Sequence, residues 1–292
     1  MQLIDGKKIA SDIRKELKEK IDKLKSEGKS VPGLVAILVG DNPASQIYVA
    51  SKSKACEEIG MRTKVEKFPS TLTEKELVIV IEKYNADKNY HGILVQLPLP
   101  KHINENKIIE AISPKKDVDG FHPMSVGNLV IGNETFVSCT PAGIQELLKR
   151  YYINTKGKHV VVVGRSNIVG KPIANLMLQK NDYANSIVTV CHSAASDLSF
   201  YTKQADILIA AIGQPEMIKG DMVKEGVVVI DVGINRIEDK VSSKGYRIVG
   251  DVAFNEVAPK SSYITPVPGG VGPMTIAMLL TNTFKAYKLY GE

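Results

Sequence analysis

Four consecutive valines, Val160–Val163, constrain the fold of this chain more than any other stretch. A run of β-branched residues predicts a buried strand, and the glycines and proline of residues 164–172 predict a tight turn into a helix over residues 173–178. This order of strand, turn and helix is typical of a dinucleotide-binding fold. In that fold glycine lets the backbone approach a pyrophosphate, and the free amides at the start of the helix face its negative charge.

The spacing of this turn departs from the usual Gly-x-Gly-x-x-Gly pattern. Ser166 stands at the place of the second glycine, and Gly170 comes one residue late. The motif alone is therefore weak evidence, and an ordinary structural turn of an α/β protein explains it equally well.

The next predicted strand indicates which nucleotide the turn would suit. It covers residues 186–190 and is followed by His192 and Ser193, without the Asp or Glu that holds the ribose 2′-hydroxyl in NAD enzymes. Arg165, His192 and Ser193 can all donate hydrogen bonds to a 2′-phosphate, and arginine offers a planar fork. We therefore predict NADP rather than NAD.

Apolar strands continue at helix-length intervals through the second half of the chain. Residues 207–212 and 227–231 are predicted strands, and residues 240–250 are predicted to form a short connection to Asp251 and Val252. Strands separated by helices imply an α/β fold with a parallel, doubly wound sheet of Rossmann type. Ligands of such sheets lie at the C-terminal ends of the strands.

The composition is that of an ordinary globular protein with room for two domains. The 292 residues are 43% hydrophobic and 24% charged, and the net charge of +6 suits an anionic small molecule or simply aids solubility. No basic and aromatic cluster indicates nucleic-acid binding, no apolar run can span a bilayer, and residues 1–6 lack the apolar core of a signal peptide. Three cysteines without metal-ligand spacing predict reduced thiols, no bound metal and a cytoplasmic location.

A lysine in the first half is the first candidate catalytic residue. The predicted strand 34–39 is followed by a helix over residues 43–59, capped by Asn42. Lys52 shares one face of this helix with three largely apolar residues, Tyr48, Ala55 and Ile59. Its side chain is therefore predicted to point inward, where burial can lower the pKa enough for proton transfer near pH 7. The alternative is a lysine that reaches solvent from the edge of the apolar stripe.

Gln96 is expected close to Lys52. The predicted strand of residues 92–97 is stopped by two prolines, which places Gln96 at its C-terminal end. The loop of residues 40–42 leads from the same edge of the predicted sheet into the helix of Lys52. The carboxamide and the ammonium can therefore meet.

Two loops have the composition of ligand-binding segments. Residues 113–121 contain Asp117 and Asp119, which favour a turn or a ligand-anchoring loop over a metal site, because no further carboxylate or histidine completes a ligand set. Residues 265–275 are rich in glycine and proline and precede a predicted helix over 276–290. They predict a stiff loop with exposed amides, an interdomain hinge, or both.

Five strings, in this order and across essentially the whole chain, resemble the motifs of the bifunctional methylenetetrahydrofolate dehydrogenase/methenyltetrahydrofolate cyclohydrolase family. They are YVASKSKA at 48–55, GILVQLPLP at 92–100, KDVDG at 116–120, GRSNIVG at 164–170 and PVPGGVGPMT at 266–275. The one departure is segment 181–186, which is longer than the usual loop before the second cofactor strand.

The resemblance implies NADP-dependent oxidation of 5,10-methylenetetrahydrofolate to 5,10-methenyltetrahydrofolate and hydrolysis of the product to 10-formyltetrahydrofolate, in one-carbon metabolism and purine biosynthesis. It implies that Lys52 is the essential lysine and that Gln96 hydrogen-bonds to it. Tyr48 would stack near the pterin, and Asp119 would anchor the pterin ring. The implied further substrate contacts are Val95, Leu97, Pro268, Gly269, Gly270, Val271 and Gly272. The implied cofactor contacts are Gly164, Arg165, Ser166, Ser193 and Ile234.

The resemblance also implies an architecture. Residues 1–143 and 274–292 would form a folate-binding catalytic domain and residues 144–273 an NADP-binding Rossmann domain, with the substrate cleft between them and a homodimer formed through the second domain. Tetrahydrofolate derivatives are the expected partners, and neither nucleic acid nor membrane is expected. Two alternatives stay open: a dehydrogenase without cyclohydrolase activity, if Lys52 is idle, and a non-catalytic nucleotide-binding sensor.

Overall fold

The computed structural model describes residues 1–239 and 245–291, and the chain divides into two compact units. One consists of Ser11–Cys139 and Ile276–Glu292 and is called the three-stranded unit below; the other consists of Met1–Ala10 and Thr140–Thr275 and is called the six-stranded unit. Both units are α/β, as predicted, and two helices pass from one to the other, α1 (Gly6–Ser26) and α10 (Val271–Tyr290).

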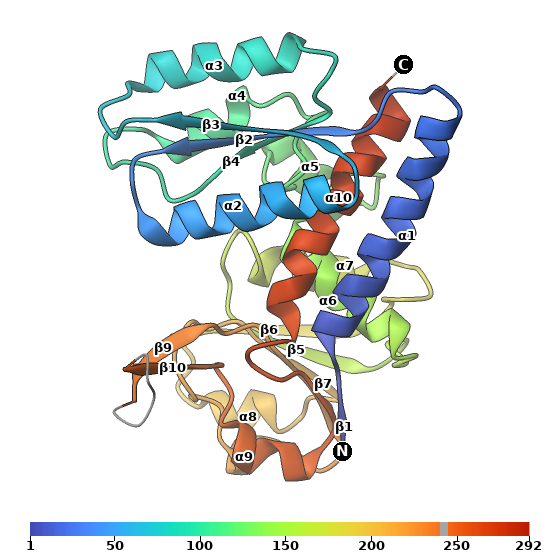
Figure 1. Cartoon of the computed structure of the whole chain (residues 1–292). Coiled ribbons are helices and arrows are strands. Elements are labelled where there is room, and N and C mark those ends of the chain that lie inside the picture. Colours follow the sequence, from blue (N-terminus) through green and yellow to red (C-terminus); the bar gives the residue numbers. More distant parts are fainter. Residues whose placement is uncertain (240–244, 292) are drawn as a thin grey trace. The chain divides into compact units, whose positions relative to one another are not determined.

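The three-stranded unit is built on a parallel sheet in the order β3 (Arg62–Phe68), β2 (Gly33–Val39), β4 (Gly92–Val95). All residues of the central strand β2 are buried, because helices cover both faces of the sheet. Figure 1 shows α2 (Pro43–Glu58) on one face and α3 (Glu74–Ala86) on the other. The remaining helices are α4 (Glu105–Ala111) and α5 (Pro123–Ile131).

Local sequence explains where α2 begins. Asn42 Oδ1 accepts hydrogen bonds from the amides of Ala44 and Ser45, and Pro43 occupies the first turn, where no amide donor is needed. The predicted cap at Asn42 is confirmed. It fixes α2, and with it Lys52, directly after the C-terminal end of β2.

The six-stranded unit contains a parallel sheet in the order β6 (Ile187–Cys191), β5 (His159–Val163), β7 (Ile207–Ala210), β8 (Val227–Asp231), β11 (Ser261–Ile264), β1 (Gln2–Leu3). The chain runs outward from β5 to β6 and then returns to β7 on the other side of β5. This reversal is the switch point at which doubly wound sheets bind their ligands. The predicted Rossmann-type sheet is confirmed.

The other elements of this unit are short. They are α6 (Cys139–Arg150), α7 (Gly170–Leu178), α8 (Leu198–Thr202), α9 (Phe254–Val257), the 3₁₀ turns η1 (Gly220–Met222) and η2 (Ala258–Lys260), and the antiparallel pair β9 (Asn235–Glu238) and β10 (Tyr246–Val249). Residues 240–250 were predicted to be a short connection. That prediction is wrong for residues 246–249, which pair with β9, while residues 240–244 lie outside the described residues.

The N-terminal residues group differently from the sequence prediction. Gln2 pairs with Tyr263 and Leu3 with Ile264, so β1 extends the six-stranded sheet and residues 1–10 belong to that compact unit. The sequence had placed them with residues 1–143. A two-residue strand carries no recognisable pattern, so only its pairing reveals it. The assignment of folate and NADP binding to particular domain boundaries stays a prediction.

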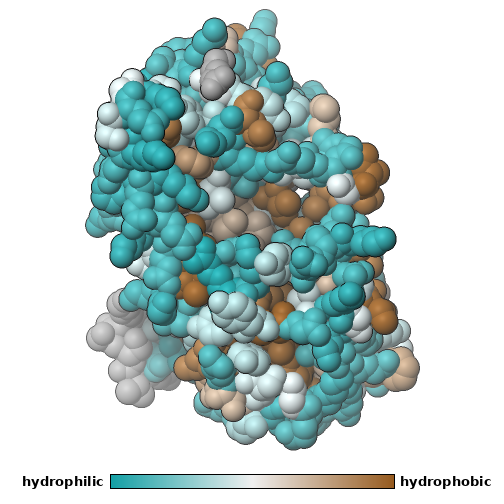
Figure 2. Space-filling model, turned by 90° about the vertical axis from the view of Figure 1, so that its right-hand side faces the viewer, coloured by the Kyte–Doolittle hydropathy of each residue, from teal (hydrophilic) through white to brown (hydrophobic). Residues whose placement is uncertain are grey.

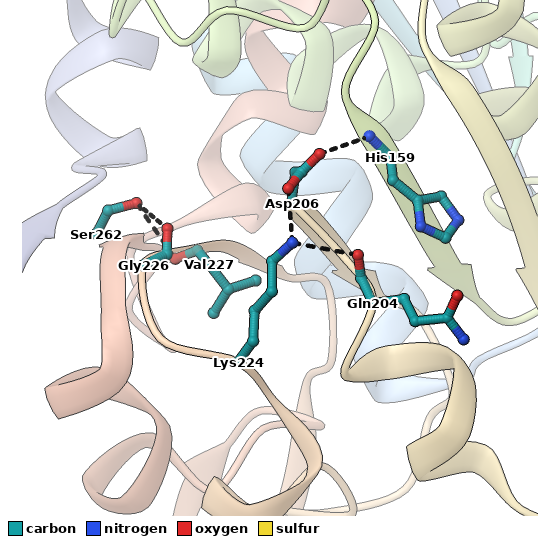
Figure 3. Close-up of polar contacts among 7 residues, drawn as sticks. All are labelled: His159, Gln204, Asp206, Lys224, Gly226, Val227 and Ser262. Atoms are coloured by element: carbon teal, nitrogen blue, oxygen red, sulfur yellow. Dashed lines mark hydrogen bonds and ion pairs between the residues drawn. The ribbon is translucent and has the colours of Figure 1, made fainter.

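A polar network ties together the N-terminal ends of several strands of the six-stranded sheet (Figure 3). Asp206 Oδ2 accepts a hydrogen bond of 2.9 Å from the amide of His159, and Lys224 Nζ donates to Asp206 Oδ1 at 2.6 Å and to Gln204 O at 3.3 Å. The hydrogen bond from Lys224 lowers the pKa of Asp206 below its ordinary value. This network lies at the sheet edge opposite to the predicted nucleotide site and is structural.

The surface has the polarity of an ordinary globular protein. On the face drawn in Figure 2, hydrophilic residues predominate and hydrophobic residues form small separate patches. Across residues 1–239 and 245–291, no helix combines the length and the apolarity that a membrane crossing requires.

Candidate active site

Lys52 and Gln96 meet at the C-terminal edge of the three-stranded sheet. Ile37 of β2 pairs with Val95 of β4, so the chain leaves both strands at the same edge, toward α2 and into Gln96. Lys52 Nζ donates a hydrogen bond of 3.1 Å to Gln96 Oε1, and both side chains are half-buried. The structure therefore brings together the two residues that the sequence placed at one edge.

A second hydrogen bond sets the orientation of the Gln96 carboxamide. Its Nε2 donates to Leu97 O at 2.7 Å, and the Gln96 amide donates to Ile37 O at 2.9 Å. Because the amide nitrogen is bound to a carbonyl, Oε1 is turned toward the Lys52 ammonium, which can only donate. Two N–H groups of that ammonium are left for other acceptors.

The helix α2 turns Lys52 toward the sheet but leaves Tyr48 outside. Lys52 lies on the face that carries three buried residues, Ser45, Val49 and Cys56. Tyr48 is 50% exposed. The predicted inward stripe is therefore wrong at Tyr48, because the centre of the buried face runs through Val49 and Cys56 and Tyr48 sits at its margin.

Asp119 lies within the electrostatic reach of Lys52. Burial raises the pKa of the Asp119 carboxyl, and the positive charge of Lys52 acts against that shift. Cys139 Sγ lies 4.0 Å from Asp119 Oδ1 and 3.5 Å from Val118 O. Burial raises the pKa of the Cys139 thiol well above its ordinary value, so this thiol is neutral. Lys52, Gln96 and Asp119 form what we call the Lys52 cluster.

Asn282 holds the loop that carries Asp119. It belongs to α10, is 6% exposed, and donates through Nδ2 to Val118 O at 2.8 Å and to Val137 O at 3.0 Å. The sequence analysis missed both Asn282 and Cys139. No local signal marks Asn282, which is 164 residues away from Val118 along the chain.

Asp117 stabilises the turn that follows it. Its carboxylate accepts hydrogen bonds from the amides of Phe121 and His122 at 3.1 and 2.9 Å and from Ser125 Oγ at 2.6 Å. Burial raises its pKa to about 6. These donors favour the predicted turn over a cation site. In the part of the chain that the structure describes, no three His, Cys, Asp or Glu side chains gather closely enough to hold a metal ion.

The turn after β5 in the six-stranded unit requires glycine at two positions. Gly164 has a φ of 127°, and a Cβ there would lie 2.2 Å from Ala211 O, at the end of the neighbouring strand β7. A Cβ on Gly170 would lie 2.3 Å from Gly164 O. The chain therefore folds tightly at the switch point between β5 and β7, as a nucleotide-binding turn does.

The first amides of α7 are already used within the turn. Ser166 Oγ accepts from the amides of Val169 and Gly170 at 3.1 and 3.3 Å, and Lys171 N donates to Ser166 O at 3.0 Å. The prediction that these amides are free to face a pyrophosphate is therefore wrong for this structure. Serine in place of the second glycine supplies an acceptor that closes over the start of the helix.

Donors for a 2′-phosphate gather at the ends of β5 and β6. Val163 pairs with Cys191, so Arg165 and the segment of His192 and Ser193 leave neighbouring strands at the same edge. Arg165 and Ser193 are exposed. His192 Nδ1 accepts from the amide of Ala194 at 3.3 Å, which leaves its other ring nitrogen as the donor. These residue types fit NADP.

Two buried carboxylates brace the loops at the ends of β7 and β8. Asp251 Oδ2 accepts from the amides of Ile212 and Gly213 at 2.6 and 2.9 Å, and its Oδ1 accepts from Asn235 Nδ2 at 2.8 Å. Asp231 accepts from the amides of Gly233, Asp251 and Val252, and burial raises its pKa to about 6. The sequence analysis missed this pair. It fixes the loop that presents Ile234, which is 56% exposed.

The glycine- and proline-rich loop is more enclosed than predicted. Pro268 is exposed and Gly269 and Gly272 are half-buried, but Gly270 and Val271 are buried. Gly6 packs against the loop so closely that a Cβ there would lie 1.8 Å from Gly270 O, and the Lys7 amide donates to Gly269 O at 2.9 Å. The helix begins at Val271, five residues before the predicted start. Val95, another predicted substrate contact, is also buried, whereas Leu97 is half-buried.

Family models match both parts of the chain. Residues 4–119 match the tetrahydrofolate dehydrogenase/cyclohydrolase catalytic domain, and residues 138–290 match the NAD(P)-binding domain of the same family. The two matches together span nearly the whole sequence.

Individual relatives match this chain over nearly their full length. The chain is 60% identical to "Bifunctional protein FolD" of Chloroherpeton thalassium over 99% of both chains. Its fold is similar to the crystal structure of the bifunctional FolD dehydrogenase/cyclohydrolase of Campylobacter jejuni, with a TM-score of 0.93, 54% identity and coverage of 99% of each chain. It is also similar to the Trypanosoma brucei enzyme solved with NADP and an inhibitor, with a TM-score of 0.92, 39% identity and coverage of 98% and 97%.

Proposed function

Because the chain belongs to the tetrahydrofolate dehydrogenase/cyclohydrolase family, we propose that it catalyses both reactions of that name. It oxidises 5,10-methylenetetrahydrofolate to 5,10-methenyltetrahydrofolate with NADP and hydrolyses the product to 10-formyltetrahydrofolate. A dehydrogenase without cyclohydrolase activity is not favoured, because curated relatives that are 60% and 58% identical are named bifunctional.

The oxidation step asks little of the protein beyond positioning. The methylene carbon gives up a hydride with its electron pair, which NADP accepts when bound, and the folate is left as the methenyl cation. No proton moves in this step, so no general base is required. Arg165, Ser193 and the turn 164–166 orient the nucleotide, and Ile234 covers one side of it. The exposed donors after β5 and β6 support this assignment.

The hydrolysis step requires proton handling. Water adds to the methenyl carbon and loses one proton, which gives a neutral hydroxyl adduct. The hydroxyl then loses its remaining proton and becomes the formyl oxygen, one proton is released overall, and the bond from this carbon to N5 breaks as N5 takes up the other proton, which leaves the formyl group on N10. Lys52 is the residue that holds and transfers this proton, and Gln96 fixes its position through the hydrogen bond to Nζ. The hydrogen bond between Lys52 and Gln96 is the observation that carries the proposal.

The remaining contacts bind the folate. Asp119 accepts hydrogen bonds from the pterin ring, and Tyr48 stacks on the pterin through its exposed ring. Pro268 and the glycines that follow it line the substrate from the loop before α10. Val95 and Val271 act through their neighbours, because both side chains are buried. The substrate cleft predicted between the two domains stays a prediction.

The proposal is tested on the second reaction alone. Methenyltetrahydrofolate is supplied directly, and its absorbance is followed with the protein, with Lys52→Met and with Lys54→Met. Lys54 lies on the same helix, is 77% exposed and sits 4.0 Å from Glu58, so it controls for loss of a lysine from α2. Lys52→Met should abolish hydrolysis and retain NADP binding, while Lys54→Met should behave as the protein does. Hydrolysis that persists in Lys52→Met would refute the role of Lys52.

Assembly and location complete the proposal. The enzyme is a homodimer that works in the cytoplasm, and its product serves purine biosynthesis. Three reduced, buried cysteines agree with a reducing compartment. Sedimentation of the purified chain distinguishes a mass of twice 31.8 kDa from the monomer.

A further inference from the structure

A cavity of about 240 Å³ lies at the N-terminal end of β4, within the three-stranded unit. Its lining includes Lys88, His91, Lys115, Lys116, Tyr90 and Tyr290. His91 directly precedes β4, whereas Gln96 directly follows it. Four residues of strand span roughly 13 Å, so the cavity and the Lys52 cluster lie at opposite ends of β4. The cavity is therefore distinct from the proposed cyclohydrolase site.

Three lysines give this cavity a positive charge that the described residues do not fully neutralise. None of Lys88, Lys115 and Lys116 forms an ion pair within residues 1–239 and 245–291. Lys116 Nζ donates 2.7 Å hydrogen bonds to two neutral acceptors, Tyr84 O and Asp87 O.

The carboxylate of Asp87 compensates this charge only in part. Burial lowers the pKa of Lys116, and the carboxylate of Asp87 acts against that shift. Asp87 Oδ1 is itself bonded to the amide and the side chain of Asn89. Lys115 Nζ lies 5.5 Å from the centroid of the Tyr290 ring.

His91 adds an unused donor to the same cavity. The residue is 6% exposed, and its Nδ1 accepts a 3.0 Å hydrogen bond from the amide of Gly33, so the neutral ring carries its proton on Nε2. Among the described residues Nε2–H has no hydrogen-bond partner. The ring is held edge-on to Tyr287 at a centroid distance of 5.0 Å. Burial, together with the charges of Lys116 and Arg62, lowers the His91 pKa to about 4.

We propose that this cavity binds a small oxyanion, the phosphate or carboxylate group of a metabolite, with the ammonium groups of Lys88, Lys115 and Lys116 and the Nε2–H of His91 as its donors. An oxyanion that enters the cavity accepts the Nε2–H that no described residue accepts, and it offsets ammonium charges that Asp87 offsets only in part. Tyr90 and Tyr290 provide apolar walls for the group that carries the anion.

Calorimetry on the NADP-saturated protein tests the proposal. NADP occupies the other site at which a phosphate would bind. Inorganic phosphate and acetate are titrated separately at an ionic strength held constant with chloride, so that the two arms distinguish a phosphate site from a carboxylate site. Saturable binding in either arm is expected. Lys115→Gln should weaken it roughly fivefold at low salt, as expected for one charge removed from a solvent-accessible anion site.

A matched variant and a local probe make the test specific. Lys75→Gln removes an exposed lysine from the far end of α3 and should leave the affinity unchanged. Ring resonances of His91, one of five histidines, should shift saturably with the same anion at pH 7. The proposal is overturned by absence of saturable binding in both arms, by equal effects of Lys115→Gln and Lys75→Gln, or by His91 resonances that do not respond.

Discussion

Replacing Gln96 by methionine isolates the contribution of one hydrogen bond to hydrolysis. Methionine is of similar length and apolar, so Gln96→Met removes the acceptor that lies 3.1 Å from Lys52 Nζ without opening a large cavity. A hydrogen bond to a charged group contributes about 1.5–3 kcal/mol, which corresponds to a roughly 10- to 100-fold loss in rate if the bond holds Lys52 in its working position. We expect a decrease of that size in kcat for methenyltetrahydrofolate hydrolysis.

The same substitution should affect stability and hydride transfer much less. Loss of the bond from Gln96 Nε2 to Leu97 O costs about 1 kcal/mol of the free energy of unfolding, measured with urea. Oxidation needs no proton transfer, so the rate of NADPH formation should fall by a smaller factor than hydrolysis. The KM for NADP should not change, because its proposed contacts lie in the six-stranded unit.

Gln46→Met is the matched control. Gln46 is an exposed residue of α2 whose side chain donates to Asp41 O at 3.1 Å, whereas Gln96 is the residue that accepts from Lys52. Both activities of this variant should equal those of the unmodified chain. A Gln96→Met enzyme that hydrolyses methenyltetrahydrofolate at the full rate would show that Lys52 needs no positioning by Gln96, and the mechanism would have to be abandoned.

Three other predictions concern the cofactor, the loop of Asp119 and the buried histidine. Arg165→Ala should raise the KM for NADP roughly tenfold or more and leave the KM for NAD unchanged, because a charge-assisted bond to the 2′-phosphate is lost; an unchanged ratio of the two KM values would contradict this. Asn282→Leu should raise the KM for methylenetetrahydrofolate and lower the free energy of unfolding by about 1–3 kcal/mol, because two carbonyls near Asp119 lose their buried donor. An unaltered KM would exclude a positioning role for Asn282. Unfolded His91 binds a proton below pH 6.5, whereas folded His91 binds one only near pH 4. The contribution of neutral His91 to the free energy of unfolding is therefore complete above pH 6.5. About 2–3 kcal/mol of that free energy is lost as the pH falls toward 4. Urea unfolding of the protein and of His91→Asn at pH 7 and pH 4.5 measures this loss. The free energies of unfolding of the two proteins are subtracted at each pH, so that the contributions of other buried groups cancel. If this difference is the same at both pH values, the prediction is disproved.

Much of the fold was predictable because it is encoded in short patterns. Val160–Val163 form a strand wherever they are buried, and the alternation of such strands with helices leaves few arrangements other than a parallel sheet. The meeting of Lys52 and Gln96 was predictable for the same reason, since each follows a strand that ends at the same edge. The cap at Asn42 also depends on neighbouring residues alone.

The errors have two origins, the packing of a helix against a distant sheet and the way a local turn closes. Tyr48 lies outside because Val49 and Cys56, not Tyr48, face the sheet, and helical spacing alone does not show where the sheet lies. The amides at the start of α7 are taken by Ser166, which depends on how the longer turn closes.

The sequence by itself determined the two α/β halves, the family and the residue types of the site, because strand and helix periodicities and local motifs survive without knowledge of neighbours. Only the tertiary structure decided that Asn282 braces the loop of Asp119, that Asp251 joins the loops after β7 and β8, and that His91 lies among lysines at the far end of β4. Burial and hydrogen bonding between distant segments exist only after the chain has folded, so no local pattern specifies them.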